Sequence, residues 1–362
     1  MKILFIVPSL DFGGAERVVS VLSNHLSKKH EVKIVILGAK TPSYDIIAEY
    51  IKLNTKVSAN LVGKLYVLIK RVILLKRVIG KDNPHLIISF MESANIPSIF
   101  ASLLLGKTNT LIISVRNNPS IFPWFYKFAI KFLYKIPKKL VAPSLGIAKD
   151  LEGRVLTNRK VDFIPNPIEL DYVNRMLSKN ERLSFQLPKH YILAVGSLSY
   201  QKGFDRLLKI FSKIKNNNLH LIIIGEGEKR SELMNLVHKY NIADYVMMPG
   251  KVKNPFYFYK NALCLGVTSR YEGWPNVINE AIASRCPVIS YNCNYGPSEI
   301  LNKENGYLID EGNENDFVDA IQRLYLQKHD REEVISNGIK TVKEYSVERI
   351  ADRWTSLINN LN

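Results

Sequence analysis

The sequence predicts an α/β protein made of two doubly wound domains, each with a parallel sheet covered by helices. Short runs rich in β-branched residues alternate with segments of helical periodicity along all 362 residues, a length that suits about two domains. The runs are apolar almost throughout, as expected of strands that are buried on both faces of a parallel sheet. Pro165 and Pro167 interrupt the alternation and predict a connector there.

Each domain is expected to contain five or more strands. Those of the first domain are expected at Ile3–Val7, Val32–Leu37, Leu86–Phe90, Leu111–Val115 and Lys139–Ala142. Those of the second are expected at Tyr191–Val195, His220–Ile224, Tyr245–Met248, Leu263–Val267 and Pro287–Ser290. The predicted domains cover residues 1–165 and 166–345, and a final helix is expected within residues 346–362. Ligands of such sheets bind beyond the carboxyl ends of the strands, so functional residues are expected directly after them.

The charge is the unusual part of the composition. Lys and Arg total 50 against 33 Asp and Glu, a formal net charge of +17. This excess favours an anionic partner, such as a phosphorylated substrate, a membrane surface or nucleic acid, although the lysine usage of an AT-rich genome would also produce it. The basic residues are spread through the expected strands and helices without a known binding module, so nucleic-acid binding is a remote alternative. The three cysteines form no C-x-x-C pair, which argues against zinc and disulfide frameworks.

The N-terminal apolar run is short and is followed by Pro8 and Asp11, which favours a first strand over a signal peptide. No uncharged apolar stretch of about 18 residues occurs in the sequence, so no transmembrane helix is expected. We therefore expect the protein in the cytoplasm.

Two glutamates, Glu272 and Glu280, flank an expected helix start in the last third of the chain. Because Pro fits the first turn of a helix, the helix is expected from about Asn276 onward. The N–H groups at such a start lack helical partners and attract anions, for example a nucleotide phosphate. The carboxylates would then accept hydrogen bonds from sugar and ribose hydroxyls, unless both simply face solvent. The residues between them are candidate donor contacts: Gly273, Trp274, Pro275, Asn276 and Val277.

Glycine-containing loops follow several expected strands, and glycine lets the backbone approach a phosphate closely. The glycines singled out are Gly13, Gly14, Gly196, Gly225 and Gly227. The first loop is not a G-x-G-x-x-G sequence, so a dinucleotide-binding fingerprint fits poorly. Lys202 follows the first strand of the second domain, where its point charge is suited to a diphosphate.

Together these segments resemble the retaining glycosyltransferases of family 4, whose E-x7-E motif is matched by Glu272 and Glu280. The resemblance includes G-G-A-E-R at Gly13–Arg17 and runs in family order to about Leu301. It implies the GT-B fold, in which two Rossmann-like domains face each other across a cleft. The first domain would bind the acceptor and the second the nucleotide-sugar donor, with the final helix crossing back to the first. It also implies transfer without a metal, and the sequence has no D-x-D cluster for one.

The resemblance implies roles for individual residues. Glu272 would contact the transferred sugar and Glu280 the ribose, while Lys202 would stabilise the leaving diphosphate. Gly225 and Gly227 would lie close to the nucleotide-sugar, and Val252 close to the nucleobase. Two positions depart from the common pattern. Ser197 stands where arginine is common, so either Ser197 bonds a phosphate or another cation replaces the arginine; Arg116 stands where many relatives carry a histidine.

The acceptor side of the first domain has several candidates. Arg116 and Asn117 belong to an S-x-R-N-x-P segment that occurs in polysaccharide-assembling relatives, and Arg116 could hold a donor or acceptor phosphate. Glu92 directly follows an expected strand and is an acceptor-side candidate. Arg116, with Glu272 and Lys202, completes the expected catalytic set, whereas Glu92 and Asn117 are expected only on the acceptor side.

Two basic, apolar helices are expected in the first domain, over Leu61–Lys81 and Phe122–Lys139. On a helical projection one arc of the first collects Lys64, Lys70, Arg71, Arg77 and Lys81, opposite most of its leucines and isoleucines. In the second, a stripe of Lys127, Lys131 and Lys135 is surrounded by Trp124, Phe125, Tyr126, Phe128, Phe132 and Tyr134. Such helices suit a bilayer interface, although both could simply cover the sheet.

These observations lead to one functional expectation. The protein would transfer a hexose or N-acetylhexosamine from a UDP-sugar to a lipid-linked glycan, in capsule, O-antigen or related polysaccharide biosynthesis. It would work at the inner face of the cell membrane, with no cofactor, metal or nucleic-acid partner. The alternatives are a soluble or protein acceptor, or a sugar-nucleotide epimerase of the same two-domain type, against which the E-x7-E and G-G-A-E-R segments argue.

Overall fold

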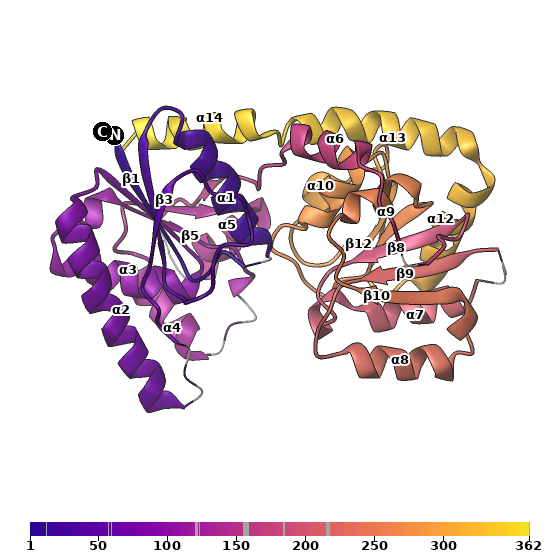
Figure 1. The fold of residues 1–362 in the computed structure, drawn as a ribbon, viewed down its shortest axis with the longest axis horizontal. Coiled ribbons are helices and arrows are strands. Elements are labelled where there is room, and N and C mark those ends of the chain that lie inside the picture. The colour runs from indigo at the N-terminus through magenta and orange to yellow at the C-terminus, as the bar shows by residue number, and fades with distance from the viewer. Residues whose placement is uncertain are drawn as a thin grey trace. The chain divides into compact units, whose positions relative to one another are not determined.

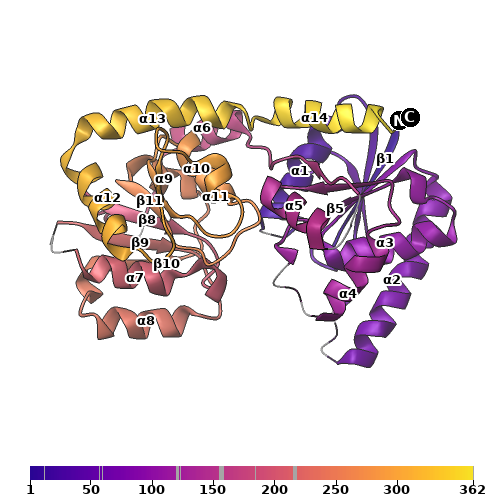
Figure 2. The same cartoon turned by 180° about the vertical axis from the view of Figure 1, so that it is seen from behind.

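The computed structural model describes residues 1–361, except residues 12, 57, 59, 120–121, 123, 155–158, 184 and 215–217. The chain forms two compact units, coloured along the chain in Figures 1 and 2. The first unit contains Met1–Pro167 together with Val347–Asn362, and the second contains Ile168–Ser346. The last helix of the chain therefore belongs to the same unit as the first strand.

The first unit is built on a seven-stranded sheet with the order β3-β2-β1-β4-β5-β6-β7. Its strands are β1 (Lys2–Val7), β2 (Glu31–Ile36), β3 (Glu49–Lys52), β4 (Leu86–Phe90), β5 (Leu111–Ser114), β6 (Lys139–Ala142) and β7 (Asp162–Phe163). Every neighbouring pair is parallel, which confirms the predicted class of sheet. The chain reverses its direction of travel across the sheet between β1 and β4, and this switch point is where doubly wound sheets bind ligands.

The helices of the first unit are α1 (Gly14–Leu26), α2 (Leu61–Asp82), α3 (Glu92–Leu104), α4 (Trp124–Leu133), α5 (Leu145–Arg154) and α14 (Val347–Asn359). Helix α2 packs against α3, and α14 packs against α1. Trp354 of α14 is buried against Phe90 of β4, with ring centroids 6.1 Å apart. Phe90 in turn stacks on Phe5 of β1 at 5.9 Å. The last helix thus completes the core beside the switch point.

The basic residues of α2 are not all arranged as predicted. Arg71 lies in its buried row with Leu75 and Ile79 and is only 8% exposed. The Arg71 guanidinium donates to Thr55 Oγ1 at 2.9 Å and to the backbone oxygen of Ser93 at 3.2 Å. The prediction that Arg71 forms part of a basic surface is therefore wrong, because its neutral hydrogen-bond partners hold it against α3.

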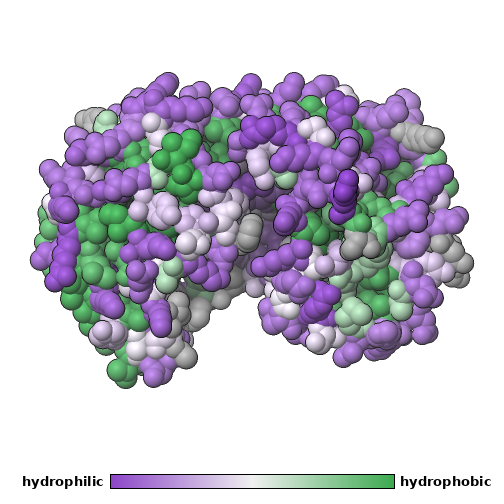
Figure 3. Space-filling view, in the orientation of Figure 1, coloured by the Kyte–Doolittle hydropathy of each residue, from purple (hydrophilic) through white to green (hydrophobic). Residues whose placement is uncertain are grey.

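Six apolar residues of α2 are exposed. They are Leu61, Val62, Leu65, Tyr66, Ile69 and Ile73, and the basic residues Lys64, Lys70, Arg77 and Lys81 are exposed with them. Figure 3 shows hydrophobic residues on the part of the first unit where Figure 1 draws α2. We call this exposed set the α2 face.

Helix α4 is shorter than the predicted helix over Phe122–Lys139. It ends at Leu133, so Lys135 lies in the following turn and Lys139 begins β6. The reason is Pro137, which cannot continue a helix and disfavours helical geometry at the residue before it. Helix α4 exposes Trp124, Phe128 and Phe132 with Lys127 and Lys131, whereas Tyr134 is buried. The side chain expected at Phe125 lies outside the described residues.

The second unit is built on a six-stranded parallel sheet with the order β10-β9-β8-β11-β12-β13. Its strands are β8 (Tyr191–Val195), β9 (His220–Ile224), β10 (Val246–Gly250), β11 (Cys264–Val267), β12 (Val288–Tyr291) and β13 (Tyr307–Ile309). The switch point of this sheet lies between β8 and β11. Strand β10 begins one residue later than predicted and extends to Gly250.

The helices of the second unit are α6 (Leu170–Ser178), α7 (Phe204–Ser212), α8 (Arg230–Lys239), α9 (Pro255–Asn261), α10 (Asn276–Ala283), α11 (Pro297–Ile300), α12 (Glu314–Leu326) and α13 (Lys328–Lys343). One hydrophobic core joins α7, α8 and α12 to β8, β9 and β12. Helices α9 and α10 also contact the sheet. In the described part of the chain, no helix combines the length and the apolar character needed to cross a membrane.

Two tryptophans of the first unit test this packing. Trp354→Ala should lower the free energy of unfolding by about 3–5 kcal/mol, because a large buried ring is lost from a close-packed core. Trp354 is 1% exposed, whereas Trp124 is 79% exposed and serves as the matched control. Trp124→Ala should change stability by less than about 0.5 kcal/mol. Urea denaturation of both variants makes the comparison, and equal effects would contradict the packing described for α14.

Candidate active site

An ion pair joins the loops that follow β8 and β11, the two strands at the switch point of the second sheet. Lys202 Nζ lies 2.6 Å from Glu272 Oε1, and the side chains are only 17% and 5% exposed. Ser269 Oγ donates to the same Glu272 oxygen at 2.7 Å. The structure therefore brings together two of the predicted catalytic residues, which are 70 positions apart in the sequence.

The loops after β8 and β9 lie backbone to backbone beside this pair. A Cβ atom on Gly225 would come within 1.8 Å of the backbone oxygen of Gly196, and Gly225 has a φ of +142°. Any side chain at this position would therefore force the loops apart. Gly196 has the methylene chain of Lys202 lying over it, at 3.2 Å from where a Cβ atom would stand. The glycines thus allow both the contact between the loops and the path of Lys202.

The predicted donor-binding turn leads from Glu272 into α10. Gly273, Trp274 and Pro275 are buried, while Asn276 and Val277 at the helix start are half-buried. Glu280 lies one turn inside α10 and accepts a hydrogen bond from Tyr259 Oη at 3.3 Å. The N-terminal N–H groups of α10 give this turn the anion affinity of a helix start.

Three further donor-side candidates lie in neighbouring loops of the second unit. Ser197 is exposed, and its hydroxyl lies 3.1 Å from that of Ser199. Gly227 lies against the backbone of Leu198, and Val252 is half-buried just after β10. The two serine hydroxyls can donate to a phosphate, but they add no charge to that of Lys202.

The switch point of the first sheet also carries buried polar residues. Glu92 begins α3, directly after Met91, whose φ is +68°. Burial raises the pKa of the Glu92 carboxyl to about 7, against weaker opposing effects of a backbone hydrogen bond and of the hydrogen bond from Asn117. The Glu92 Oε1 atom has no hydrogen-bond partner among the described residues. Positive φ at a bulky non-glycine residue costs free energy, and such strained residues cluster at active sites.

Arg116 follows β5 and is buried with little to balance its charge. Its Nη1 donates to Asn166 Oδ1 at 2.6 Å, and its guanidinium carbon lies 4.9 Å from the centroid of the Phe90 ring. Its Nε and Nη2 have no partner among the described residues, and burial lowers its pKa to about 9. A buried cation in this state is suited to an incoming anion.

The remaining predicted site residues of the first unit are two glycines at the start of α1 and several exposed polar residues. Gly13 precedes α1 and exchanges hydrogen bonds with Tyr44 Oη, and Gly14 begins the helix. The Glu16 carboxylate lies so close to Gly13 that a Cβ atom there would meet it at 2.3 Å. Helix α1 therefore already has a carboxylate at its start. Asn117, Lys70, Lys127, Lys131 and Lys135 are exposed.

Three residues beside the Lys202–Glu272 pair were not among the predicted site residues. Ser269 bonds Glu272, and Arg270 forms an ion pair with Asp205 at 2.6 Å. All three lie in the segments that carry Lys202 and Glu272. Their position after β11 and at the start of α7 was visible in the sequence, but nothing there indicates that the two segments meet.

Family models match both halves of the chain. Residues 12–172 match the model for glycosyltransferase family 4, and residues 178–341 match the model for glycosyl transferases group 1. The chain is 25% identical to the amylovoran biosynthesis glycosyltransferase AmsD of Erwinia amylovora, covering 99% of both chains.

It is also 27% identical to the N-acetylgalactosamine-N,N'-diacetylbacillosaminyl-diphospho-undecaprenol 4-alpha-N-acetylgalactosaminyltransferase of Campylobacter jejuni, over 97% of both chains. The sucrose-phosphate synthase of Thermosynechococcus elongatus has the same fold, with a TM-score of 0.83 at 18% identity over 100% of this chain and 99% of that one.

The two doubly wound units and the family models that match them define a glycosyltransferase of the GT-B fold. The chain belongs to the retaining glycosyltransferases of family 4. Its reaction is the transfer of a sugar from a nucleotide-sugar to an acceptor.

The raised pKa of Glu92 predicts that the free energy of unfolding depends on pH. A carboxyl whose pKa is raised from 4.5 to about 7 by folding stabilises the native state fully below pH 4.5, and this contribution is lost as the pH rises through 7. Relative to Glu92→Gln, the wild type should lose on the order of 1–3 kcal/mol over this range. Hydrogen exchange of the β4–α3 segment at several pH values measures it. A difference that stays constant with pH would show that folding leaves the pKa of Glu92 unchanged.

Proposed function

We propose that this glycosyltransferase moves a hexose or N-acetylhexosamine from a UDP-sugar to a lipid-linked glycan during bacterial polysaccharide assembly. The observation that carries the proposal is the partly buried Lys202–Glu272 pair near the start of α10, because a cation and a carboxylate lie together where doubly wound sheets bind ligands. Support for the donor comes from the Anabaena protein HepE, whose structure in complex with UDP-glucose has a TM-score of 0.80 to this chain at 16% identity.

The two side chains suit different parts of the donor. As the bond between the sugar and the diphosphate breaks, negative charge grows on the leaving oxygen, and the Lys202 ammonium stabilises it. The Glu272 carboxylate, held by Ser269, accepts hydrogen bonds from hydroxyls of the transferred sugar. Glu280 does the same for the ribose. The α10 N-terminus adds its partial positive charge, so the leaving group is stabilised by the protein's own groups without a metal.

The acceptor proposal rests on the first unit and on the relatives. Arg116 is a buried cation without an acidic partner among the described residues, and it is suited to a phosphate of a diphospho-lipid acceptor. The Campylobacter relative acts on a diphospho-undecaprenol acceptor according to its name, and AmsD belongs to amylovoran biosynthesis. Glu92, directly after β4, would bind a hydroxyl of the acceptor.

A lipid-linked acceptor requires access to a membrane surface, and the α2 face is suited to it. Leu65, Tyr66 and Ile69 are more than half exposed, and exposed lysines and arginines surround them. Apolar side chains enter the interface while the basic ones attract anionic headgroups. Trp124, Phe128 and Phe132 of α4 add exposed aromatic area of the same kind.

A soluble polymer acceptor is the second candidate. The poly(ribitol-phosphate) alpha-N-acetylglucosaminyltransferase of Staphylococcus aureus is 26% identical over 86% of this chain, and its name specifies a phosphate polymer. The same Arg116 cation would suit that acceptor. The α2 face distinguishes the two candidates, since a soluble polymer does not need it.

Glu272→Ala tests the donor site. The variant should transfer sugar at least about 100-fold more slowly than the wild type, because the sugar loses the group that orients it. Transfer from radiolabelled UDP-sugars to a membrane fraction measures this. Glu333→Ala is the control, since Glu333 is an exposed glutamate of α13 in the same unit, and it should leave transfer unchanged. Undiminished transfer by Glu272→Ala would remove the E-x7-E segment from the mechanism.

The double variant Leu65→Ser/Ile69→Ser tests the membrane surface. Binding to vesicles with 30% phosphatidylglycerol, a composition on the order of an anionic bacterial leaflet, should fall at least about tenfold, since each buried aliphatic side chain contributes about 1.5–3 kcal/mol. Leu326→Ser is the control because Leu326 is 75% exposed in the second unit. Co-sedimentation measures both. Equal binding by the double variant and the wild type would favour the soluble acceptor.

A further inference from the structure

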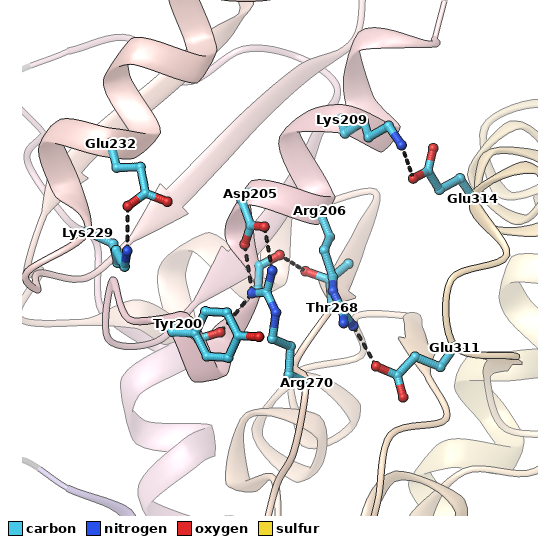
Figure 4. A network of polar contacts seen from close by, with 11 residues as sticks. Tyr200, Asp205, Arg206, Lys209, Lys229, Glu232, Thr268, Arg270, Glu311 and Glu314 are labelled. Atoms are coloured by element: carbon cyan, nitrogen blue, oxygen red, sulfur yellow. Dashed lines mark hydrogen bonds and ion pairs between the residues drawn. The ribbon is translucent and has the colours of Figure 1, made fainter.

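A second ion pair links the two loops that carry Lys202 and Glu272. Arg270 lies after β11, and Asp205 lies in the first turn of α7, after the loop that follows β8. Arg270 Nη1 donates to Asp205 Oδ1 at 2.9 Å, and Nη2 donates to Oδ2 at 2.6 Å. Figure 4 shows the guanidinium facing the carboxylate with both contacts drawn. This two-pronged arrangement fixes direction as well as distance.

Arg270 contacts the same loop in three further ways. Its Nη1 also donates to the backbone oxygen of Tyr200 at 2.8 Å, and its guanidinium carbon lies 4.0 Å from the centroid of the Tyr200 ring. Its backbone N–H donates to the oxygen of Gln201 at 2.8 Å. The guanidinium is thus held at its edge by oxygens and at its face by an aromatic ring, so it has one well-defined orientation.

Neighbouring hydrogen bonds extend the link to both sides of Lys202. Thr268 Oγ1 donates to the backbone oxygen of Gly203 at 2.8 Å, and Gln201 Nε2 donates to that of Tyr271 at 3.1 Å. Lys202 therefore lies between two residues that are each bonded to the loop carrying Glu272. A shift of either loop would change the distance between the Lys202 ammonium and the Glu272 carboxylate.

We propose that Arg270 and Asp205 are positioning residues that hold the Lys202 ammonium and the Glu272 carboxylate at the relative positions that the donor requires. The lysine ammonium lies at the end of a flexible four-carbon side chain and therefore has to be held in place. Its charge helps the reaction only where it lies close to the leaving oxygen, on which negative charge develops. Ser197 and Ser199 add hydroxyls but no cation to this loop. The placement of one ammonium group therefore decides much of the stabilisation.

The Arg270–Asp205 pair is better suited to fixing the positions of the two loops than to stabilising the fold. The Arg270 and Asp205 side chains are 16% and 33% exposed, and ion pairs near the surface contribute little free energy of folding. Burial alone would raise the pKa of Asp205, but the hydrogen bonds and charge of Arg270 outweigh it and leave the pKa below its usual value. The carboxylate is thus ionised throughout the neutral range.

The same helix provides a matched control. Arg206, one residue after Asp205, pairs with Glu311 at 2.8 Å, and Lys209 pairs with Glu314 at 2.8 Å. Glu311 lies between β13 and α12, so its pair joins α7 to a segment that carries neither Lys202 nor Glu272 (Figure 4). Glu311→Gln removes the carboxylate that pairs with Arg206 of α7, as Asp205→Asn removes the one that pairs with Arg270, and it leaves the two loops untouched.

The experiment measures donor hydrolysis and transfer with UDP-N-acetylglucosamine and UDP-glucose, and UDP binding by calorimetry, at least about ten degrees below the melting temperature of every variant. Arg270→Ala and Asp205→Asn should each lower kcat about tenfold or more, with the KM of the donor changed less than about threefold. Arg270→Lys should recover only part of kcat, since it restores the charge without the two-pronged contact. Glu311→Gln should match the wild type.

The double variant Arg270→Ala/Asp205→Asn should be no slower than Arg270→Ala, because both changes remove one interaction. Wild-type kcat in folded Arg270→Ala, or losses that multiply in the double variant, would overturn the proposal. The inference rests on the proposed donor site, which Lys202→Ala and Glu272→Ala test separately. If those variants lose activity while Arg270→Ala keeps it, only the positioning role fails. If they keep activity as well, the donor site itself fails.

Discussion

The contact between Lys202 and Glu272 is the interaction on which the proposed chemistry depends. A partly buried lysine and a buried glutamate are each costly alone, and their mutual contact at 2.6 Å, together with the Ser269 hydroxyl, compensates that cost. The pair exists only because β8 and β11 are neighbours in the sheet. The ammonium and the carboxylate satisfy each other, and a donor would replace that contact with a diphosphate on one side and sugar hydroxyls on the other.

The two units share one architecture but differ in how the polar groups at their switch points are paired. Each sheet reverses its strand order at a switch point, and each switch point carries buried polar groups. In the second unit these groups are paired and tied by Arg270 to a neighbouring loop. In the first, Glu92 and Arg116 keep polar atoms that have no partner among the described residues. Groups left in this state are expected where a substrate completes the hydrogen bonding.

The strands beside the switch points were predictable, since their long apolar runs have few other interpretations. Strands β3, β7 and β13 were missed because they are short edge strands with half-exposed residues. The motifs identified Lys202 and Glu272 singly, but their contact depends on strand order, which local patterns do not contain. Arg71 was misplaced for a similar reason: a helical projection defines faces without saying which one is buried. Pro137, by contrast, was a visible stop signal for α4.

Calorimetric titration of UDP into the wild type, Lys202→Ala and Glu272→Ala tests the central claim most directly. If the lysine binds the diphosphate and the glutamate binds only the sugar, Lys202→Ala should weaken UDP binding about tenfold or more. Glu272→Ala should bind UDP at least as tightly as the wild type, because it frees the ammonium from its partner. Equal weakening of UDP binding in both variants would contradict this division of roles and the proposed site with it.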